Sequence, residues 1–413
     1  MTDTSRRPYV VAGVLIAVWA GGLSLLAATV LSGADLYFFS YYSIDYTLGF
    51  VRRGLGGELL GMFGDYFVGM RALRWLSTLA FSAGLLAVTW TAWTHPAAAP
   101  GSAQRRRILA LLLPVLPFGF LFALYSARPD LFGGAALAAL AVLLVRARQR
   151  STALLGCAAF GAVTAVLALI HEAVPVEFAL GAVLAIATLP RALPRGSARI
   201  GMLLAVLPGL VSTFLVAVAG RRGVAGDLCA RIPVRRIENP YALEQSPQGV
   251  LDYLSGRNRP YTEYHDWMCR NILPMWDWSP GQAVRYVFGL GVGQLIASAV
   301  FGALVIAAAI AVLRRASNVP IRDFLAAAAP WRWWLVAAAA LLIPVFLTAF
   351  DWTRWMVIIG FDIAVVYLLY AAGRPQAGTP ASRRTVTVCV TAGVLFALLP
   401  VGIVAGFAVQ PPV

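Results

Sequence analysis

Long apolar runs are the feature that most constrains this chain. Hydrophobic residues make up 60% of its 413 residues and charged residues only 12%. A helix of about 20 apolar residues spans the hydrocarbon core of a bilayer, and inside lipid a helix pairs its backbone polar groups internally. The alternating segments of about ten residues that are typical of outer-membrane barrels are absent. The sequence therefore predicts an all-α polytopic membrane protein, organised as a single domain over residues 1–413.

The apolar runs predict eleven membrane-spanning helices. Their ranges are 9–31, 73–94, 108–125, 131–146, 153–170, 175–190, 201–220, 286–313, 333–349, 356–373 and 385–408. The first run is longer than the apolar region of about 7–15 residues in a signal peptide, so we expect a retained helix. With the N-terminus in the cytoplasm, an odd number of spans places the C-terminus outside.

The arginines test this order of spans. All 33 basic residues are arginine, and the net charge is +15. Arginine is concentrated in the cytoplasmic segments of membrane proteins, and every predicted cytoplasmic segment has at least two. They are Arg6 and Arg7; Arg105, Arg106 and Arg107; Arg146, Arg148 and Arg150; Arg191, Arg195 and Arg199; Arg314, Arg315, Arg322 and Arg332; and Arg374, Arg383 and Arg384. The positive charge thus has a topological reason, and no nucleic-acid partner is expected.

Two long loops are expected outside the membrane, at 32–72 and 221–285. The first contains Asp35 and Asp45, followed by an apolar pattern from Phe50 to Phe67 that predicts a short interfacial helix. Arg52, Arg53 and Glu58 lie in that pattern, and nearby glycines allow a close approach by a ligand or another helix. Ionisable side chains at membrane depth indicate a functional site; the alternative is a surface helix with paired, snorkelling charges.

Four more sequence motifs place charge at outer helix ends. They contribute Arg128 in YSARPDLF, His171 and Glu172 in LIHEAVPVEF, Asp351 and Arg354 in FDWTRWM, and His265 in the second loop. Each has a structural alternative. These are local pairing of Arg128 with Asp130, an interfacial hydrogen-bonding pair of His171 and Glu172 with no catalytic role, and anchoring of the tryptophans in the aromatic belt at the membrane interface. Asp362 falls inside a predicted span and needs a partner.

Cysteines and absent motifs narrow the chemistry. Cys229 and Cys269 share the second outer loop, so we expect a disulfide between them, whereas Cys157 and Cys389 fall inside spans. The chain has no Walker A motif, no GxGxxG, no HExxH and no CxxC. The first loop has no DxD pair. We therefore expect no cofactor and no metal ion.

The layout resembles the GT-C superfamily of polyprenyl-phosphate-sugar-dependent glycosyltransferases. The resemblance rests on the cytoplasmic N-terminus, the acidic first outer loop with Asp35 and Asp45, and the large outer loop after helix seven. It covers helices one to seven and both loops, without a specific sequence motif. It implies transfer of a sugar from a polyprenyl-phosphate donor to a glycan or glycolipid acceptor, at the periplasmic face of a bacterial inner membrane.

The resemblance also implies roles for the charged residues. Asp45 would be the catalytic base, with Asp35 as its competitor, and the donor phosphate would bind Arg52, Arg53, Arg128 and Arg354. Further substrate contacts would come from Glu58, His171, Glu172, His265 and Asp351. One alternative is an O-antigen ligase or polymerase, in which His265 or His171 would be the central catalytic residue. The other is a flippase or transporter for lipid-linked sugars, which predicts charged residues near the midplane.

Overall fold

The computed structural model describes residues 7–29, 40–95, 103–125, 127–190, 193–239, 242 and 246–399. Regular structure in these ranges is almost entirely helical. The helices are α1 (Arg7–Thr29), η2 (Ser40–Tyr42), η3 (Tyr46–Leu48), α3 (Gly54–Gly61), α4 (Tyr66–Thr94), α5 (Gln104–Leu112), η4 (Leu113–Val115), α6 (Phe120–Tyr125), α7 (Asp130–Arg146), α8 (Arg150–Ala168), α9 (Val174–Glu177), α10 (Ala179–Thr188), α11 (Arg195–Ala219), α12 (Ala225–Cys229), α13 (Pro247–Leu254), α14 (Tyr264–Trp267), η6 (Met268–Ile272), η7 (Leu273–Trp276), α15 (Pro280–Gly289), α16 (Val292–Ser317), α17 (Ile321–Ala328), η8 (Ala329–Trp331), α18 (Arg332–Ala340), α19 (Ile343–Thr348), α20 (Trp352–Ala372), η9 (Pro375–Gly378) and α21 (Arg383–Leu398). Strands β1 (Arg236–Glu238) and β2 (Tyr261–Glu263) pair antiparallel.

The expectation of a polytopic helical membrane protein is confirmed. Eight helical stretches of the described chain are long and apolar enough to cross a bilayer: Arg7–Thr29, Tyr66–Thr94, Gln104–Tyr125, Arg150–Ala168, Arg195–Ala219, Val292–Ser317, Ile321–Thr348 and Trp352–Ala372. The other three predicted spans also fall on helices, but these are shorter. They are α7, the stretch Val174–Thr188, and the described part of α21. Residues 400–408 of the last predicted span lie outside the described residues.

Helix α20 forms the centre of the bundle, and α1 lies at its edge. In the most apolar part of α20, 83% of the residues are buried, against 6% in α1. Since apolar surface that no protein covers must face lipid in a membrane protein, α1 is largely a lipid-facing helix. In contrast, α20 packs against α4, α7, α10 and α16.

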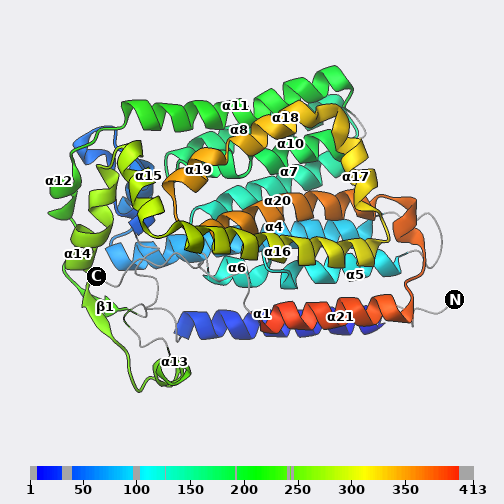
Figure 1. Cartoon of the computed structure of the whole chain (residues 1–413), viewed down its shortest axis with the longest axis horizontal. Helices are drawn as coiled ribbons and strands as arrows, with labels where there is room; N and C mark the ends of the chain where they lie inside the picture. Colours follow the sequence, from blue (N-terminus) through cyan, green and yellow to red (C-terminus); the bar gives the residue numbers. More distant parts are fainter. Residues whose placement is uncertain are drawn as a thin grey trace.

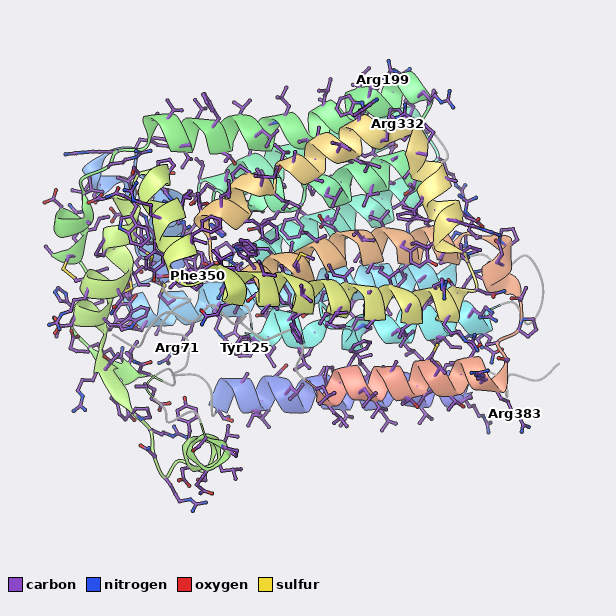
Figure 2. The ribbon with its side chains drawn as sticks, in the orientation of Figure 1. Arg71, Tyr125, Arg199, Arg332, Phe350 and Arg383 are labelled. Atoms are coloured by element: carbon purple, nitrogen blue, oxygen red, sulfur yellow. A yellow bond between two sulfur atoms is a disulfide. The ribbon has the colours of Figure 1, made fainter. Side chains whose placement is uncertain are left out.

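The bundle has two different ends (Figure 1). The two long connections gather at one end, where α12, α14, α15 and β1 lie; we call this the loop end. The start of α1 lies at the other end, together with α17. Figure 2 shows Arg199, Arg332 and Arg383 at that second end, and we call it the arginine end. The structure thus separates the charge-mixed loops from the arginine-rich turns, as the sequence predicted.

The predicted continuous helix from Phe50 to Phe67 is wrong in its length. Helix α3 ends at Gly61, and α4 begins at Tyr66. The break has a local cause, because the Asp65 carboxylate accepts a hydrogen bond from the backbone N–H of Val68 at 2.8 Å and caps α4. Residues 66–72, expected in the loop, therefore extend the membrane helix by two turns.

The two long connections dock on each other at the loop end. Arg221 N donates to Phe50 O at 2.8 Å, and the indole N–H of Trp276 donates to Arg52 O at 3.4 Å. The Asp277 carboxylate accepts from the backbone N–H groups of Gly223, Val224 and Ala225 and so holds the start of α12. The two connections form one assembly over the ends of the helices.

Candidate functional site

An arginine pair from the first loop meets a glutamate that follows α8. Arg52 Nε donates to Glu172 Oε1 at 2.6 Å, and Arg53 Nε donates to Glu172 Oε2 at 2.9 Å. The Arg53 guanidinium also lies over the rings of Tyr41 and Trp276, 5.0 and 4.9 Å from their centroids. Arg53 adopts a left-handed backbone conformation with φ 64°, which is unusual for a residue with a side chain. The ion pair and the two rings hold that conformation.

A second ion cluster lies deeper and joins α7 to the start of α20. Arg354 pairs with Asp130, the first residue of α7, and donates to Asp351 Oδ2 at 2.8 Å. Arg128 donates to the same Asp351 oxygen at 2.8 Å. The expected local pairing of Arg128 with Asp130 is therefore wrong, because each residue pairs instead with the segment around Asp351.

His171 connects the two clusters. Its Nε2 lies 3.3 Å from Asp130 Oδ1, and its Nδ1 lies 3.7 Å from Glu172 Oε2. Burial, helped by the charge of Arg53, lowers the pKa of His171 and favours the neutral imidazole. Burial also acts to raise the pKa of Glu172, but Arg52 and Arg53 outweigh it and hold that pKa well below its usual range.

Two further acids are buried in the bundle. The side chain of Glu177 at the end of α9 is inaccessible to solvent, and neither carboxylate oxygen has a hydrogen-bond partner among the described residues. Asp362 in α20 accepts a hydrogen bond from the backbone N–H of Gly181 at 3.0 Å, which supplies the partner that the sequence required. Sequence reasoning missed Glu177 and Asp130 as site residues; an acid six residues after His171 in an otherwise apolar stretch was the available signal.

Asp45 lies apart from both ion clusters, in a pocket of about 220 Å³ between the two loops. It caps η3 by accepting from Thr47 N at 3.0 Å, and its Oδ1 lies 3.5 Å from Arg231 Nη1. The lining residues are Ser43, Asp45, Gly57, Leu60, Gly61, Phe63, Tyr66, Leu228 and Arg231. An acid and an arginine therefore share one pocket whose other wall is apolar, and Arg231 was not singled out in the sequence.

Three hydroxyl groups meet beside this pocket, and two of them belong to the lining residues Ser43 and Tyr66. Tyr66 Oη donates to Ser43 Oγ at 2.9 Å and lies 3.0 Å from Tyr264 Oη, and Ser43 Oγ lies 3.2 Å from Tyr264 Oη. Tyr264 is fully buried. The side chains come from the first loop, α4 and the second loop, so the pocket depends on the docking of all three.

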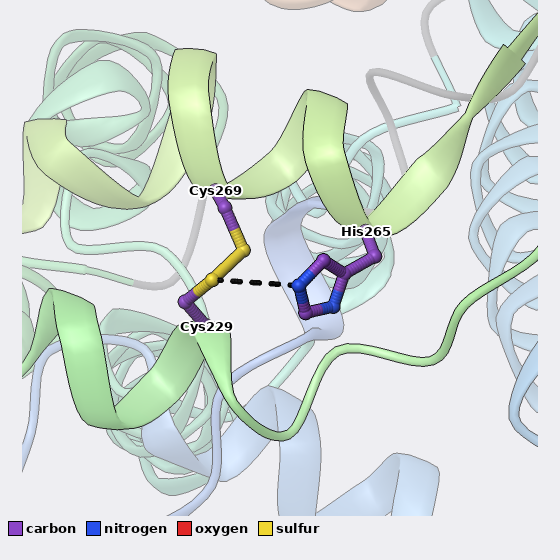
Figure 3. Close-up of side chains that lie close together, drawn as sticks. All are labelled: Cys229, His265 and Cys269. Carbon is purple, nitrogen blue, oxygen red and sulfur yellow. Dashed lines mark hydrogen bonds between the residues drawn. A yellow bond between two sulfur atoms is a disulfide. The ribbon is translucent and has the colours of Figure 1, made fainter.

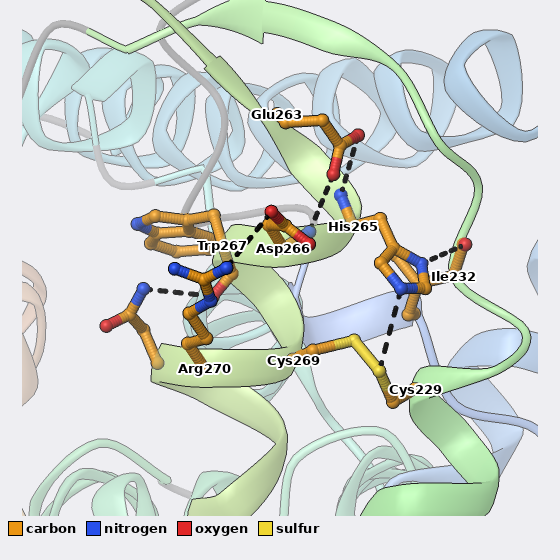
Figure 4. The surroundings of a disulfide bond; sticks show 9 residues. Cys229, Ile232, Glu263, His265, Asp266, Trp267, Cys269 and Arg270 are labelled. Carbon is orange, nitrogen blue, oxygen red and sulfur yellow. Dashed lines mark hydrogen bonds and ion pairs between the residues drawn. A yellow bond between two sulfur atoms is a disulfide. The ribbon is translucent and has the colours of Figure 1, made fainter.

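The predicted disulfide between Cys229 and Cys269 is confirmed, with Cα atoms 5.2 Å apart. His265 lies beside it (Figure 3), with Nε2 3.8 Å from Cys229 Sγ. Its Nδ1 lies 2.8 Å from Ile232 O (Figure 4). The ring of His265 thus supports the disulfide and lies apart from the Asp45 pocket.

The predicted site residues therefore fall into four groups. Seven of them come together in linked ion clusters that the sequence did not predict: Arg52, Arg53, Arg128, His171, Glu172, Asp351 and Arg354. Asp45 forms the pocket with Arg231. Glu58 accepts from Tyr46 N at 3.0 Å and holds the first loop together, and His265 lies at the disulfide. Asp35 lies outside the described residues.

The apolar bundle and its charged loop end define a multi-pass α-helical membrane protein. The chain belongs to the family described as Uncharacterised membrane protein Rv1490, which matches residues 9–397. Two relatives are Uncharacterized protein Rv1490 of Mycobacterium tuberculosis and Uncharacterized protein Mb1527 of Mycobacterium bovis. Each is 41% identical over 404 residues, which cover 97% of this chain and 92% of the relative. No solved structure matches the chain significantly.

Proposed function

We propose that this protein is a membrane-embedded glycosyltransferase. In this proposal it moves a sugar from a polyprenyl-phosphate donor to a glycan or glycolipid acceptor at the periplasmic face of a bacterial inner membrane. The proposal keeps eleven membrane spans in a GT-C-like arrangement, with the loop end outside. The observation that carries it is the Asp45 pocket, which combines a carboxylate, a cation 3.5 Å away and an apolar wall.

In the proposed reaction, the charged and the apolar residues that line the pocket have different roles. The acceptor hydroxyl oxygen forms a bond to the anomeric carbon of the sugar, and its proton passes to the Asp45 carboxylate. The bond between the anomeric carbon and the phosphate oxygen breaks, so polyprenyl phosphate leaves with the extra negative charge. Arg231 stabilises that charge. Leu60, Phe63 and Leu228 supply apolar surface for the first isoprene units.

Arg52 and Arg53 take a different part in this proposal from the one expected. Both guanidinium groups are engaged with Glu172, and neither arginine lines the Asp45 pocket. Because the clusters contain acids as well as arginines, their excess positive charge is small. We therefore propose Arg231 as the first phosphate contact, with Arg52, Arg53, Arg128 and Arg354 as supports for the loop end.

The pocket is tested by donor binding and turnover in purified protein. A short-chain polyprenyl phosphate is the binding probe, and a panel of polyprenyl-phosphate sugars with a glycan acceptor reports transfer. We expect Asp45→Asn to keep probe binding and to lose transfer by at least 100-fold, in line with the rate contribution of about 10²–10⁴ from proton transfer. Arg231→Ala should weaken both, since a phosphate contact exists before and during the reaction.

Three further variants separate the possible outcomes. Arg270→Ala removes an exposed arginine of the same loop and should leave probe binding unchanged. If Asp45→Asn keeps near-normal transfer and Asp35→Asn has none, the base is Asp35. If both keep transfer, the proposal is rejected in favour of a histidine-centred ligase or polymerase, for which His171→Ala is the corresponding test.

A further inference from the structure

Unpartnered atoms from three buried side chains converge at the inner side of the loop end. They are Asp130 Oδ1, both carboxylate oxygens of Glu177 and both ring nitrogens of His171; none has a hydrogen-bond partner in the described ranges. The residues are 1%, 0% and 4% exposed. A buried polar atom without a partner destabilises the folded chain, and more strongly when it is charged. Several such atoms at one point indicate a missing positively charged partner.

The spacing of these atoms fits ligands around a cation. One donor atom from each residue lies within 4.8 Å of the other two, and His171 Nε2 lies 3.3 Å from Asp130 Oδ1. Groups that share a proton directly lie about 2.5–3.2 Å apart. Two ligand atoms that are each about 2.1 Å from one tetrahedral metal ion are about 3.4 Å apart. A decrease in the longest of these donor–donor distances brings all three donor atoms within bonding distance of one ion.

The neighbouring residues occupy the positions of supporting partners. Arg354 binds Asp130 through the other carboxylate oxygen, Oδ2, which leaves Oδ1 for an ion. Glu172 lies 3.7 Å from His171 Nδ1, on the far side of the ring. Metal-bound histidines commonly place a carboxylate on their second nitrogen, and metal-bound carboxylates are commonly held by a donor. Asp130 shares its negative charge with Arg354, whereas neither carboxylate oxygen of Glu177 has a hydrogen-bond partner in the described part of the chain.

We propose that Asp130, His171 and Glu177 form a binding site for a divalent transition-metal ion. The site joins the start of α7, the segment after α8 and the end of α9, so the ion ties together the helix ends beneath the loops. One imidazole and two carboxylates suit ions such as Zn²⁺ or Mn²⁺. The sequence analysis did not predict this site, because its ligands come from separate segments without a metal-binding motif. This inference does not depend on the proposed glycosyl transfer.

The site is tested by metal content and metal titration of the full chain in detergent. After chelation and addition of Zn²⁺ or Mn²⁺, the wild type should retain close to one equivalent of one of these ions and unfold at a higher temperature than the chelated form. His171→Ala and Glu177→Gln should lose the retained ion. Glu172→Gln removes the charge beside His171 Nδ1, together with the charge that Arg52 and Arg53 face, and should weaken affinity about 10–100-fold.

Matched controls keep the result specific. Asp362→Asn removes another fully buried acid, and His265→Ala alters a histidine beside two cysteines that are joined to each other; both variants should retain the ion. If the ligand variants fail to fold, Co²⁺ bound to the wild type should show the visible absorption of a nitrogen-ligated site. Wild-type protein that binds none of these ions would overturn the proposal and indicate a protonated Glu177. Retention of the ion by a folded His171→Ala variant would also overturn it.

Discussion

At the scale of single residues, glycines in α3 set the shape of the Asp45 pocket. Gly57 N donates to Ile44 O at 2.9 Å, so the backbone of α3 lies directly against the segment that leads into Asp45. Gly56 makes a similar approach, since a Cβ atom there would lie 2.8 Å from Tyr41 O. The sequence predicted a close approach at these glycines; the approaching group is the chain itself.

We expect Gly57→Ala to destabilise the first loop by about 1–3 kcal/mol, the usual cost of overpacking. Its Cβ atom would collide with the backbone at Ile44 and Asp45, which cannot move as a flexible side chain can. Thermal unfolding in detergent measures the change. Gly64→Ala is the control, because a Cβ atom there meets no heavy atom within 4 Å. Equal unfolding temperatures for the two variants would contradict the close packing.

At the scale of helices, arginines at the arginine end serve as caps as well as topological signals. Arg105 donates to Arg315 O and Ala316 O at the end of α16 and to Thr379 O and Pro380 O beyond α20. Arg106 donates to Ala372 O, the last residue of α20, at 2.8 Å. The last carbonyl groups of a helix have no partner within it and carry partial negative charge. Arg105 and Arg106 thus tie three helix ends together.

Arg105→Met should therefore lower stability by an amount on the order of 2–4 kcal/mol, because four carbonyl groups lose a charged donor. Arg199→Met is the control: Arg199 is an exposed arginine at the same end, and its replacement should have little effect on unfolding. Thermal unfolding of both variants, measured under identical detergent conditions, checks this. A similar small effect in both would mean that the arginines act only through topology.

Glu263, the last residue of β2, is expected to make the stability of the fold depend on pH. Partial burial acts to raise the pKa of Glu263, but the backbone N–H groups of Asp266, Arg235 and His265 donate to its carboxylate and hold that pKa below its ordinary value of 4.5. The ionised form is therefore bound more favourably in the folded chain. Its contribution is present above pH 4.5 and is lost as the pH falls through the folded pKa.

We expect Glu263→Gln to unfold at a lower temperature than the wild type at pH 7, and the difference to shrink as the pH is lowered below 4.5. Protonation then removes from the wild type the same charge that the variant lacks. Paired thermal unfolding curves at pH 7 and pH 3.5 provide the measurement. A difference that stays constant between these pH values would show that the charge of Glu263 is unimportant.

At the scale of the whole molecule, the sequence predicted what depends on local pattern and missed what depends on tertiary contact. The apolar runs fall on helices because a long apolar run is marked by its own residues, but breaks such as the one between α18 and α19 were not predicted. The pairing of Asp130 with Arg354 joins residues 224 positions apart, and no local pattern marks it. The disulfide was predictable because only Cys229 and Cys269 lay outside the spans. The roles proposed for Arg231 and Glu177 depend on contacts between separate segments of the chain, which the local sequence does not show.

The distribution of arginines also predicts the orientation of the molecule in the membrane. Gln149 precedes α8 in the turn after α7, beside Arg146, Arg148 and Arg150, whereas Gln248 lies in α13 in the second long connection. Because arginine-rich segments stay in the cytoplasm, a reporter fused after Gln149 should be active as a cytoplasmic marker. A reporter fused after Gln248 should be active only outside. Paired fusions of an enzyme that works outside and a fluorescent protein that works inside measure both positions. The opposite result at either position would contradict the predicted order of spans. The opposite result at both positions would place the Asp45 pocket in the cytoplasm, where a donor exposed at the outer face is out of reach.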